Sequence, residues 1–186
     1  RTPLFTLLTV VVLAGGLGLS IFTWSFLHTA ILKPLPLDEG DRVVRLMVSV
    51  QGRGLASIDA ADFAAMRSRI TRLTDVGIYG DREFVIGSGE GTRSISAATV
   101  EANIFRTTRT APALGRGFTP EDQLPGAEPV IVLSWWGWRS VFGSDTAVLN
   151  TTVRLSGVAP RIIGVMPEGF GFPVAAEAWV PIGPGI

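Results

Sequence analysis

An uncharged apolar stretch near the N-terminus constrains this chain more than any other feature. Residues 4–32 read LFTLLTVVVLAGGLGLSIFTWSFLHTAIL, without a single Asp, Glu, Lys or Arg. As an α-helix rising 1.5 Å per residue, this stretch is longer than the roughly 30 Å hydrocarbon core of a bilayer. Lys33-Pro34-Leu35-Pro36 follows, and proline disfavours helix at the residue before it. The sequence therefore predicts a transmembrane helix within residues 1–33.

Two other interpretations of this stretch are weaker. A cleaved signal peptide has an apolar region of about 7–15 residues and a small-x-small cleavage site, which His28-Thr29-Ala30 fits poorly. A buried core helix is seldom this long. Charge leaves the orientation open, because Arg1 precedes the stretch while Lys33 and Arg42 follow it. The pairs Ala14/Gly18 and Gly16/Ser20 either permit close helix packing or reflect the frequency of glycine in membrane helices.

The remaining residues limit the chemistry that the chain can perform. Residues 33–186 carry 15 basic and 16 acidic side chains, a formal net charge of −1, so no partner role for nucleic acid is expected. The chain has no cysteine, which excludes disulfides and thiolate chemistry. Its one histidine, His28, ends the apolar stretch and leaves the rest without an imidazole base or metal ligand. We expect no catalytic, cofactor-binding or metal-binding residue.

Carboxylate pairs and one glycine-rich loop are the motifs that could suggest otherwise. Close pairs suited in principle to acid and base work are Asp59/Asp62, Asp81/Glu83 and Glu121/Asp122. Solvated turn and cap positions are the default interpretation of these carboxylates, and nothing in the sequence brings them together in a pocket. The loop GSGEGT at 87–92 lacks the lysine of a P-loop and carries Glu90, so it is interpreted as a hairpin loop.

Three tryptophans, Trp135, Trp136 and Trp138, lie within four consecutive residues. On one short helix they cannot all face the same core, so we expect one of them to be exposed. Packing is the first interpretation of the cluster, and an aromatic anchor for a partner is the second.

Periodicity in residues 34–186 predicts a mixed α+β domain with several hairpins and two or three helices. Strands are predicted over 42–50, 76–79, 83–86, 93–97, 130–133, 153–155 and 161–165. Helices are predicted over 59–70, 101–105 and 135–142, the first packing on a sheet through Phe63, Met66 and Ile70, and the last ending at Gly143. A hairpin turn is expected at Ser156-Gly157. The domain boundaries are thus 1–33 and 34–186, and we expect the chain to be a fragment truncated at its C-terminus.

The order of short phrases along the chain resembles the MacB-like periplasmic core domain of MacB/FtsX-type ABC-transporter permeases. Each phrase is weak alone, but together they follow the family's order over nearly the whole chain. The phrases are Lys33-Pro34-Leu35-Pro36 after the apolar helix, Asp41-Arg42-Val43-Val44-Arg45-Leu46, Ala102-Asn103-Ile104-Phe105, residues 112–122 (PALGRGFTPED), Val132-Leu133-Ser134, Trp138, Phe142-Gly143-Ser144-Asp145, residues 163–170 (IGVMPEGF) and Trp179-Val180-Pro181.

Two positions depart from the family pattern. Relatives carry an apolar residue, Gly and another apolar residue where this chain has Thr107-Thr108-Arg109-Thr110. Asn150 occupies a usual Gly position, a mild change because Asn tolerates the left-handed backbone region.

The resemblance implies a cytoplasmic N-terminus, a globular part on the periplasmic side of the bacterial inner membrane, and three further membrane helices beyond Ile186. It implies a non-catalytic permease subunit that couples ATP hydrolysis in a separate cytoplasmic ABC ATPase to export or to mechanical work on an extracytoplasmic substrate. The other partners implied are a second permease half or a second copy, and a periplasmic protein. The alternative is a stand-alone membrane-anchored sensor or binding module.

Overall fold

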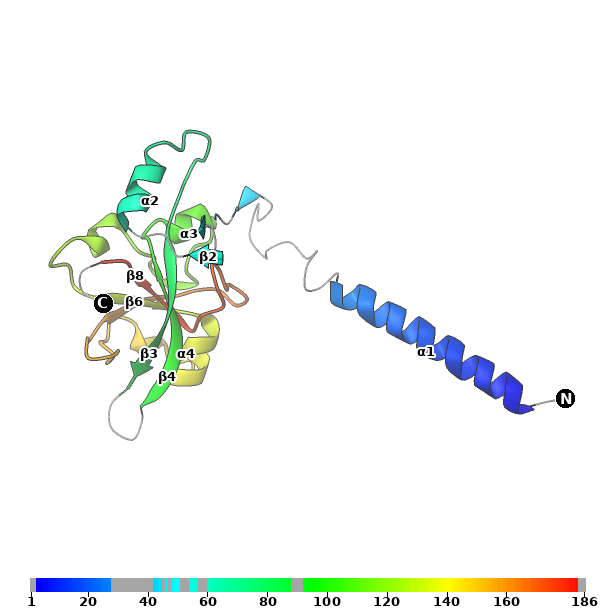
Figure 1. The fold of residues 1–186 in the computed structure, drawn as a ribbon. Coiled ribbons are helices and arrows are strands. Elements are labelled where there is room, and N and C mark those ends of the chain that lie inside the picture. Colours follow the sequence, from blue (N-terminus) through cyan, green and yellow to red (C-terminus); the bar gives the residue numbers. More distant parts are fainter. Residues whose placement is uncertain are drawn as a thin grey trace. The chain divides into compact units, whose positions relative to one another are not determined.

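The computed structural model describes residues 3–27, 42–44, 46, 48–50, 54–56, 60–87 and 92–183. The chain divides into two compact units, Arg1–Leu35 and Pro36–Ile186. In the first unit, helix α1 spans Pro3–Leu27 and is long and apolar enough to cross a membrane, with a mean hydropathy of 2.0 over Leu7–Leu27 (Figure 1). The predicted end of this helix near Leu32 lies outside the described residues.

Three hydroxyl side chains of α1 form hydrogen bonds within the helix itself. The Thr9 hydroxyl donates to the Phe5 carbonyl at 2.9 Å, and the Ser20 and Thr23 hydroxyls donate to Gly16 and Leu19 at 2.8 Å each. Such bonds pair these three hydroxyl donors within the helix, and in hydrocarbon an unpaired polar group costs several kcal/mol, of order 2–7. These three residues are therefore compatible with a membrane helix.

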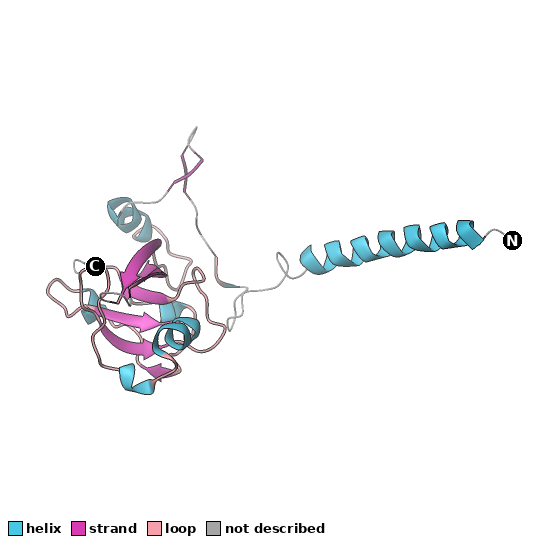
Figure 2. Cartoon of the chain, turned by 90° about the horizontal axis from the view of Figure 1, so that it is seen from below, coloured by secondary structure: helices cyan, strands magenta, loops and turns pink. Residues whose placement is uncertain are grey.

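A six-stranded mixed sheet forms the centre of the second unit, in the order β3-β4-β8-β6-β7-β5 (Figure 2). Its strands are β3 (Tyr79–Ile86), β4 (Arg93–Val100), β5 (Leu114–Gly115), β6 (Val130–Leu133), β7 (Arg161–Val165) and β8 (Ala178–Pro181). The pairs β4–β8 and β6–β7 are parallel, and the other neighbours are antiparallel. A separate two-stranded sheet joins β1 (Val48–Val50) to β2 (Gly54–Ala56).

Both faces of the sheet are covered, as the central strand β6 shows. All four of its residues are buried, and they alternate between two hydrophobic clusters: Ile131 and Leu133 in one, Val130 and Val132 in the other. Helix α4 (Trp135–Phe142) covers the first face, and helix α3 (Ile104–Thr107) lies over the second. The residues from 166 to 176 complete the second cluster. Strand β6 is thus an interior strand, as predicted.

The remaining helices are α2 (Ala60–Arg67) and the two 3₁₀ turns η4 (Pro120–Gln123) and η5 (Thr146–Val148). Among the described residues of the second unit there are three α-helices, in line with the predicted two or three. The apolar stripe of α2 predicted that this helix packs across a face of the sheet, but it does not lie there. It lies beside one end of β3 and β4 (Figure 1), with Phe63 buried and Met66 and Ile70 half-buried.

Several predicted boundaries are corrected by the structure. Of the strand predicted over 42–50, the described residues form a strand only at Val48–Val50. Of the predicted strand 76–79 only Tyr79 is in a strand, and it belongs with the predicted strand 83–86 to one longer strand, β3, which runs through Gly80 and the exposed residues 81–83. Helix α3 begins at Ile104 rather than at residue 101, and α2 ends at Arg67 rather than at residue 70.

The predicted hairpin at Ser156-Gly157 has its turn but not its first strand. Both residues have positive φ, 47° and 92°, which is the geometry of a tight type I′ turn. Residues 153–155 form only isolated bridges, because Leu155 pairs with both Ile86 and Val158 while β7 pairs with β5 and β6. The segment 153–158 therefore contacts the end of β3 through the bridge between Leu155 and Ile86.

Candidate functional site

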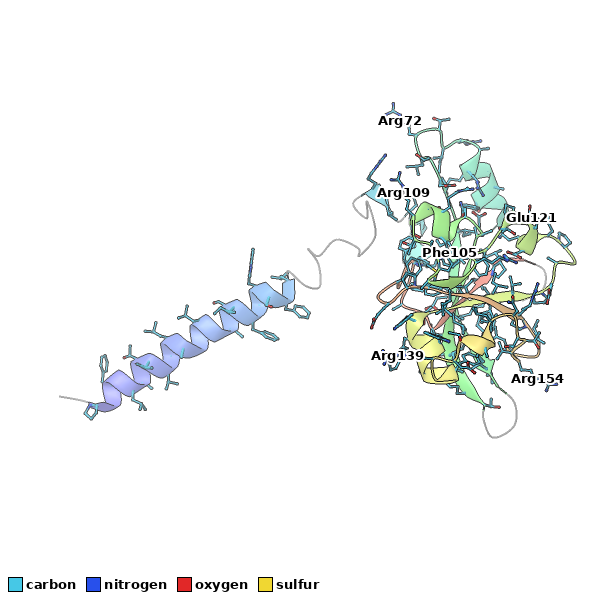
Figure 3. All side chains as sticks on the ribbon, turned by 180° about the vertical axis from the view of Figure 1, so that it is seen from behind. Arg72, Phe105, Arg109, Glu121, Arg139 and Arg154 are labelled. Atoms are coloured by element: carbon cyan, nitrogen blue, oxygen red, sulfur yellow. The ribbon has the colours of Figure 1, made fainter. Side chains whose placement is uncertain are left out.

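The carboxylate pairs suggested by the sequence do not converge on a common site. Asp62 lies on α2, Asp81 and Glu83 lie on β3, and Glu121 and Asp122 lie in η4, while Asp59 falls outside the described residues. Within the described part of the chain, no group of three or more His, Cys, Asp or Glu side chains could hold a metal ion. In Figure 3, Glu121 lies at the periphery of the domain, whereas Phe105 lies inside it.

Asp122 has a structural role that its bonds make plain. Its carboxylate accepts two bonds from the Arg116 guanidinium, at 2.7 and 2.9 Å, and one from the Thr119 backbone N–H at 2.8 Å. Burial raises the pKa of Asp122, but these hydrogen bonds together lower it by more, so the net pKa lies below the ordinary value. Thr119, Pro120 and Asp122 thus begin the short helix η4, and Arg116 fastens it to the end of β5.

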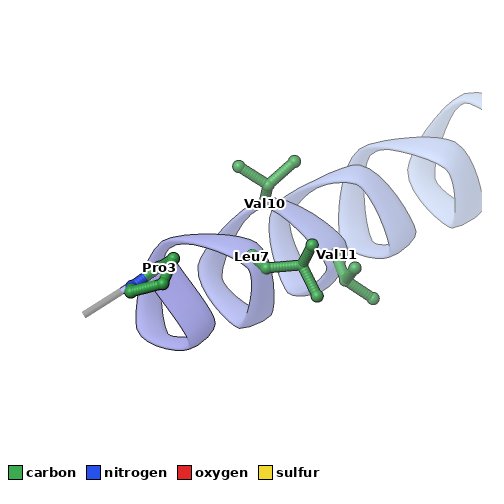
Figure 4. A pocket seen from close by; sticks show the side chains of 4 residues that line it. All are labelled: Pro3, Leu7, Val10 and Val11. Atoms are coloured by element: carbon green, nitrogen blue, oxygen red, sulfur yellow. The ribbon is translucent and has the colours of Figure 1, made fainter.

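A hollow on α1 is lined by Pro3, Leu7, Val10 and Val11. Figure 4 shows that all four side chains project from the same helix, with no second element as a wall. In a helix of this hydropathy such side chains suit lipid or a neighbouring helix rather than a small ligand.

The three tryptophans separate into two that pack and one that is exposed. Trp138 is 6% exposed, its ring lies 5.1 Å from that of Trp135, and its Nε1 donates to the Asp145 carbonyl at 2.8 Å. Trp136, in contrast, is 67% exposed. The expectation that one tryptophan is exposed is confirmed. Since Trp136 stands on the outer side of α4, it is the one member of the cluster free to contact a partner.

A polar junction that the sequence did not reveal joins α2 and the segment after it to the end of β4. The Arg67 guanidinium contacts both oxygens of Glu101, at 3.0 and 3.2 Å. The Arg106 guanidinium contacts both oxygens of Asp75, at 3.0 and 3.1 Å. Asn103 donates to Asp75 and to the Val76 carbonyl, at 3.2 Å each. The partners are 27 to 34 positions apart in sequence, so no local pattern could have paired them.

The two carboxylates of this junction have opposite pKa shifts. The hydrogen bonds from Arg106 hold the pKa of Asp75 below its usual value. Burial raises the pKa of Glu101, and the Arg67 charge only partly offsets the effect. The partners of Asp75 therefore favour its ionised form. For Glu101, burial opposes the ionised form and the Arg67 charge favours it.

A close backbone approach explains the glycines of the phrases at 112–122 and 163–170. Gly115 has φ of +71°, and a Cβ on it would lie 2.1 Å from the Ile163 carbonyl oxygen. A Cβ on Gly164 would lie 2.4 Å from the Arg116 carbonyl oxygen. A Cβ has no room at these two positions, where β5 pairs with β7. The glycines of both phrases are therefore required for the packing of this sheet edge.

The two departures from the family pattern are also accommodated. Arg109 and Asn150 have φ of 51° and 64°, a region that glycine adopts without strain and that asparagine tolerates. The buried Thr108 hydroxyl donates to the Ile104 and Phe105 carbonyls, at 3.0 and 3.2 Å, and so satisfies the end of α3. The end of α3 is thus closed by a polar side chain.

These observations define a class: a mixed α/β domain whose recurring phrases are packing motifs, preceded by one helix able to span a membrane. The chain belongs to the family of the MacB-like periplasmic core domain, which it matches over residues 6–184. A search of curated proteins found no match. Together with the apolar α1, membership identifies a membrane-anchored, transporter-associated protein of the MacB/FtsX permease type with an extracytoplasmic domain.

Solved structures show the same fold. The extracellular domain of the noncanonic ABC-type transporter YknZ from Gram-positive bacteria is 20% identical, with a TM-score of 0.55 over 67% of this chain and 62% of that one. The periplasmic region of MacB from Actinobacillus actinomycetemcomitans is 18% identical, with a TM-score of 0.52 over 63% of this chain and 52% of that one. The matched part of this chain thus spans less than two thirds of either domain.

Proposed function

We propose that this chain is a non-catalytic permease component that couples ATP hydrolysis in a separate cytoplasmic ABC ATPase to export or mechanical work outside the membrane. The family match over residues 6–184 carries the proposal. In this proposal residues 1–33 anchor the chain in the inner membrane, and residues 34–186 form a periplasmic core domain. A second permease half or a second copy completes the membrane part, and a periplasmic protein receives the motion.

The contacts of the domain support a mechanical role. A domain that transmits motion requires stiff connections between the segment nearest the membrane helix and the central sheet. The ion pairs Arg67–Glu101 and Arg106–Asp75 connect segment 60–78 to the end of β4 and to α3. Arg106 uses two nitrogens for the two Asp75 oxygens, which fixes orientation as well as distance. We infer that force on α2 is passed to the sheet at this junction.

Absence of enzymatic activity is part of the same proposal. The described carboxylates lie apart or in ion pairs that hold secondary structure together, as at Asp75 and Asp122. Substitution of Glu121 and Asp122 by Gln and Asn is expected to leave export per folded molecule nearly unchanged. Loss of export by a folded, membrane-inserted double variant would instead assign a catalytic role to this pair.

The decisive experiment uses the full-length permease with its ATPase in proteoliposomes, measuring ATP hydrolysis and export together. Pro34 and Pro36 are replaced by glycine, because proline restricts the backbone directly after the predicted membrane helix. A stiff connection predicts that hydrolysis persists while export falls. The matched control replaces Pro125, an exposed proline after η4, and should change neither activity.

Equal export by the Pro34/Pro36 variant and the unaltered permease, at equal membrane abundance, would show that stiffness there is not required. The broader proposal has its own test, purification of the permease from membranes. Recovery with a nucleotide-binding subunit supports the coupling role. Recovery without one, together with direct binding of a small molecule, would favour the alternative of a membrane-anchored sensor, for which the exposed Trp136 is a candidate contact.

A further inference from the structure

Strand β3 is the first strand of the six-stranded sheet, and β4 pairs with it along one side only. Backbone groups alternate in direction along a strand. The Ile78 carbonyl accepts from the Glu101 N–H, at the continuation of the β3–β4 pair, so the even-numbered residues face β4. The odd-numbered residues of β3 therefore direct their N–H and C=O groups to the outer edge of the sheet.

Among the described residues, hydrogen bonds cover the end of this outer edge at Val85 and Gly87. The Val85 carbonyl accepts from the Ser156 N–H at 2.8 Å, the Val85 N–H donates to the Ser156 hydroxyl at 2.9 Å, and the Gly87 N–H donates to the Arg154 carbonyl at 3.0 Å. The outward backbone groups of Asp81 and Glu83 have no hydrogen-bond partner among the described residues. These two residues form an open edge, defined here as the outer backbone of residues 81–83.

The side chains at the open edge carry a definite charge pattern. Asp81, Arg82 and Glu83 are all exposed, and the two carboxylates lie on one face with Arg82 on the other. The Ser96 and Ser94 hydroxyls donate to Asp81 and Glu83, at 3.4 and 3.3 Å. Within the described residues, neither carboxylate forms an ion pair. The open edge therefore presents two unneutralised negative charges, two residues apart, beside free backbone groups.

This charge pattern determines which strand can pair with the edge. In each antiparallel register that brings two copies of the open edge together through their outward groups, Asp81 or Glu83 faces a carboxylate of the other copy. Like charges directly opposite one another destabilise a strand pair, and charged edges are a common guard against self-association. A strand with Lys or Arg at alternate positions places a cation opposite each carboxylate instead.

We propose that the open edge of β3 is a docking site for an extended, basic segment of a partner protein, which adds to the sheet as a further antiparallel strand. Backbone bonds to Asp81 and Glu83 supply the pairing, and alternate Lys or Arg residues on the incoming strand supply the selectivity. This proposal does not depend on coupling to an ATPase, because binding is measured on residues 1–186 alone.

The experiment measures fluorescence anisotropy of a labelled synthetic peptide in which lysine alternates with threonine and valine, titrated with the chain in detergent micelles. Binding should be saturable, weaken with salt, and slow hydrogen exchange at the amides of residues 81 and 83. The same peptide with glutamate in place of lysine should not bind. Equal binding of both peptides, or none by the lysine peptide, overturns the proposal and leaves β3 as a guarded edge only.

Two variants test the backbone and the charge together and the charge alone. Glu83→Pro removes an outward N–H as well as one carboxylate without touching the ladder to β4, at a position where an edge strand tolerates proline. It should weaken the lysine peptide about tenfold. The matched variant Asp81→Asn/Glu83→Gln keeps every backbone group, so binding should persist about tenfold weaker with its salt dependence reduced. Unchanged binding by both variants, each with an unaltered thermal transition, would place the peptide elsewhere and overturn the proposal.

Discussion

The Arg67 guanidinium lies 3.0 Å from the Glu101 carboxylate, across 34 residues of sequence. Arg67 ends α2, and Glu101 directly follows β4, the strand that joins the β3 edge to the interior of the sheet. The Arg67 guanidinium also lies over the ring of the buried Phe63, 5.8 Å from its centre. Arg67 therefore contacts both the buried face of α2 and the Glu101 carboxylate. This single side chain connects helix packing to sheet position.

Exchange of the two charges at this junction tests it directly. Arg67→Glu and Glu101→Arg alone should each lower export by the full-length permease, because each places like charges together. The double variant should restore it in large part. Because Arg67 is half-exposed, the pair contributes less than about 1 kcal/mol to stability, so thermal unfolding should hardly change. A double variant as defective as the single ones would show that the ion pair is not the transmitting contact.

The close pairing of β5 with β7 predicts that substitution of two glycines has very different effects on stability. Gly115→Ala should destabilise the domain by about 3 kcal/mol. Alanine is strained at the positive φ of this position, and its Cβ would also clash with the Ile163 carbonyl oxygen. Gly126 also has positive φ, +84°, but nothing lies within 4 Å of its Cβ position. Gly126→Ala should therefore cost only about 1 kcal/mol. Urea unfolding followed by tryptophan fluorescence measures both, and equal losses would contradict the clash.

The tryptophans of α4 allow a similar comparison. Trp138→Ala removes a buried ring and its bond to Asp145, and should cost about 3–5 kcal/mol. Trp136→Ala should change stability by less than about 0.5 kcal/mol, because the ring is exposed. Export by the full-length Trp136→Ala permease then reports on a partner contact. Normal export at normal abundance would leave Trp136 without a role in binding.

Local signals account for the parts of the fold that the sequence predicted well. Strand β6 and helix α4 have the predicted bounds, because a β-branched run, a serine N-cap and a left-handed glycine all act within a few residues. Ser134 accepts from the Gly137 N–H at 2.9 Å, and Gly143 has φ of 60°. The positive φ of Asn150 also follows from the residue type alone.

Non-local contacts determine the parts that the sequence did not predict. Strand β5 has two residues, and it is a strand only because Gly115 and Gly164 let two backbones approach. Strand β8 was visible only as the phrase Trp179-Val180-Pro181, because its place between β4 and β6 depends on two distant partners. The junction at Asp75 and Glu101 and the free edge at residues 81–83 both result from topology, which periodicity does not encode.

Acid should destabilise the domain in part through Asp122. Its folded-state pKa is lowered, so the carboxylate contributes stability above the unfolded pKa of about 3.9 and loses it as pH falls through the lower folded value. Asp75 has the same sign. Glu101 has the opposite sign, because its raised pKa favours the folded state only while the group is protonated, an advantage lost as pH rises through that value.

Asp122→Asn should therefore lower the free energy of unfolding by about 1.5–3 kcal/mol at pH 7, where the native carboxylate accepts from Arg116 and Thr119. The difference from the unaltered chain should shrink as pH falls below the unfolded pKa of about 3.9, since protonation then progressively removes the charge that the Asp122→Asn variant never carries. Glu101→Gln is the matched control of opposite sign, because its effect on stability should become more favourable from acid to neutral pH. Urea unfolding of the three chains from pH 2.5 to 7 measures these curves. A constant gap for Asp122→Asn over that range would show that ionisation of Asp122 does not hold η4 to β5.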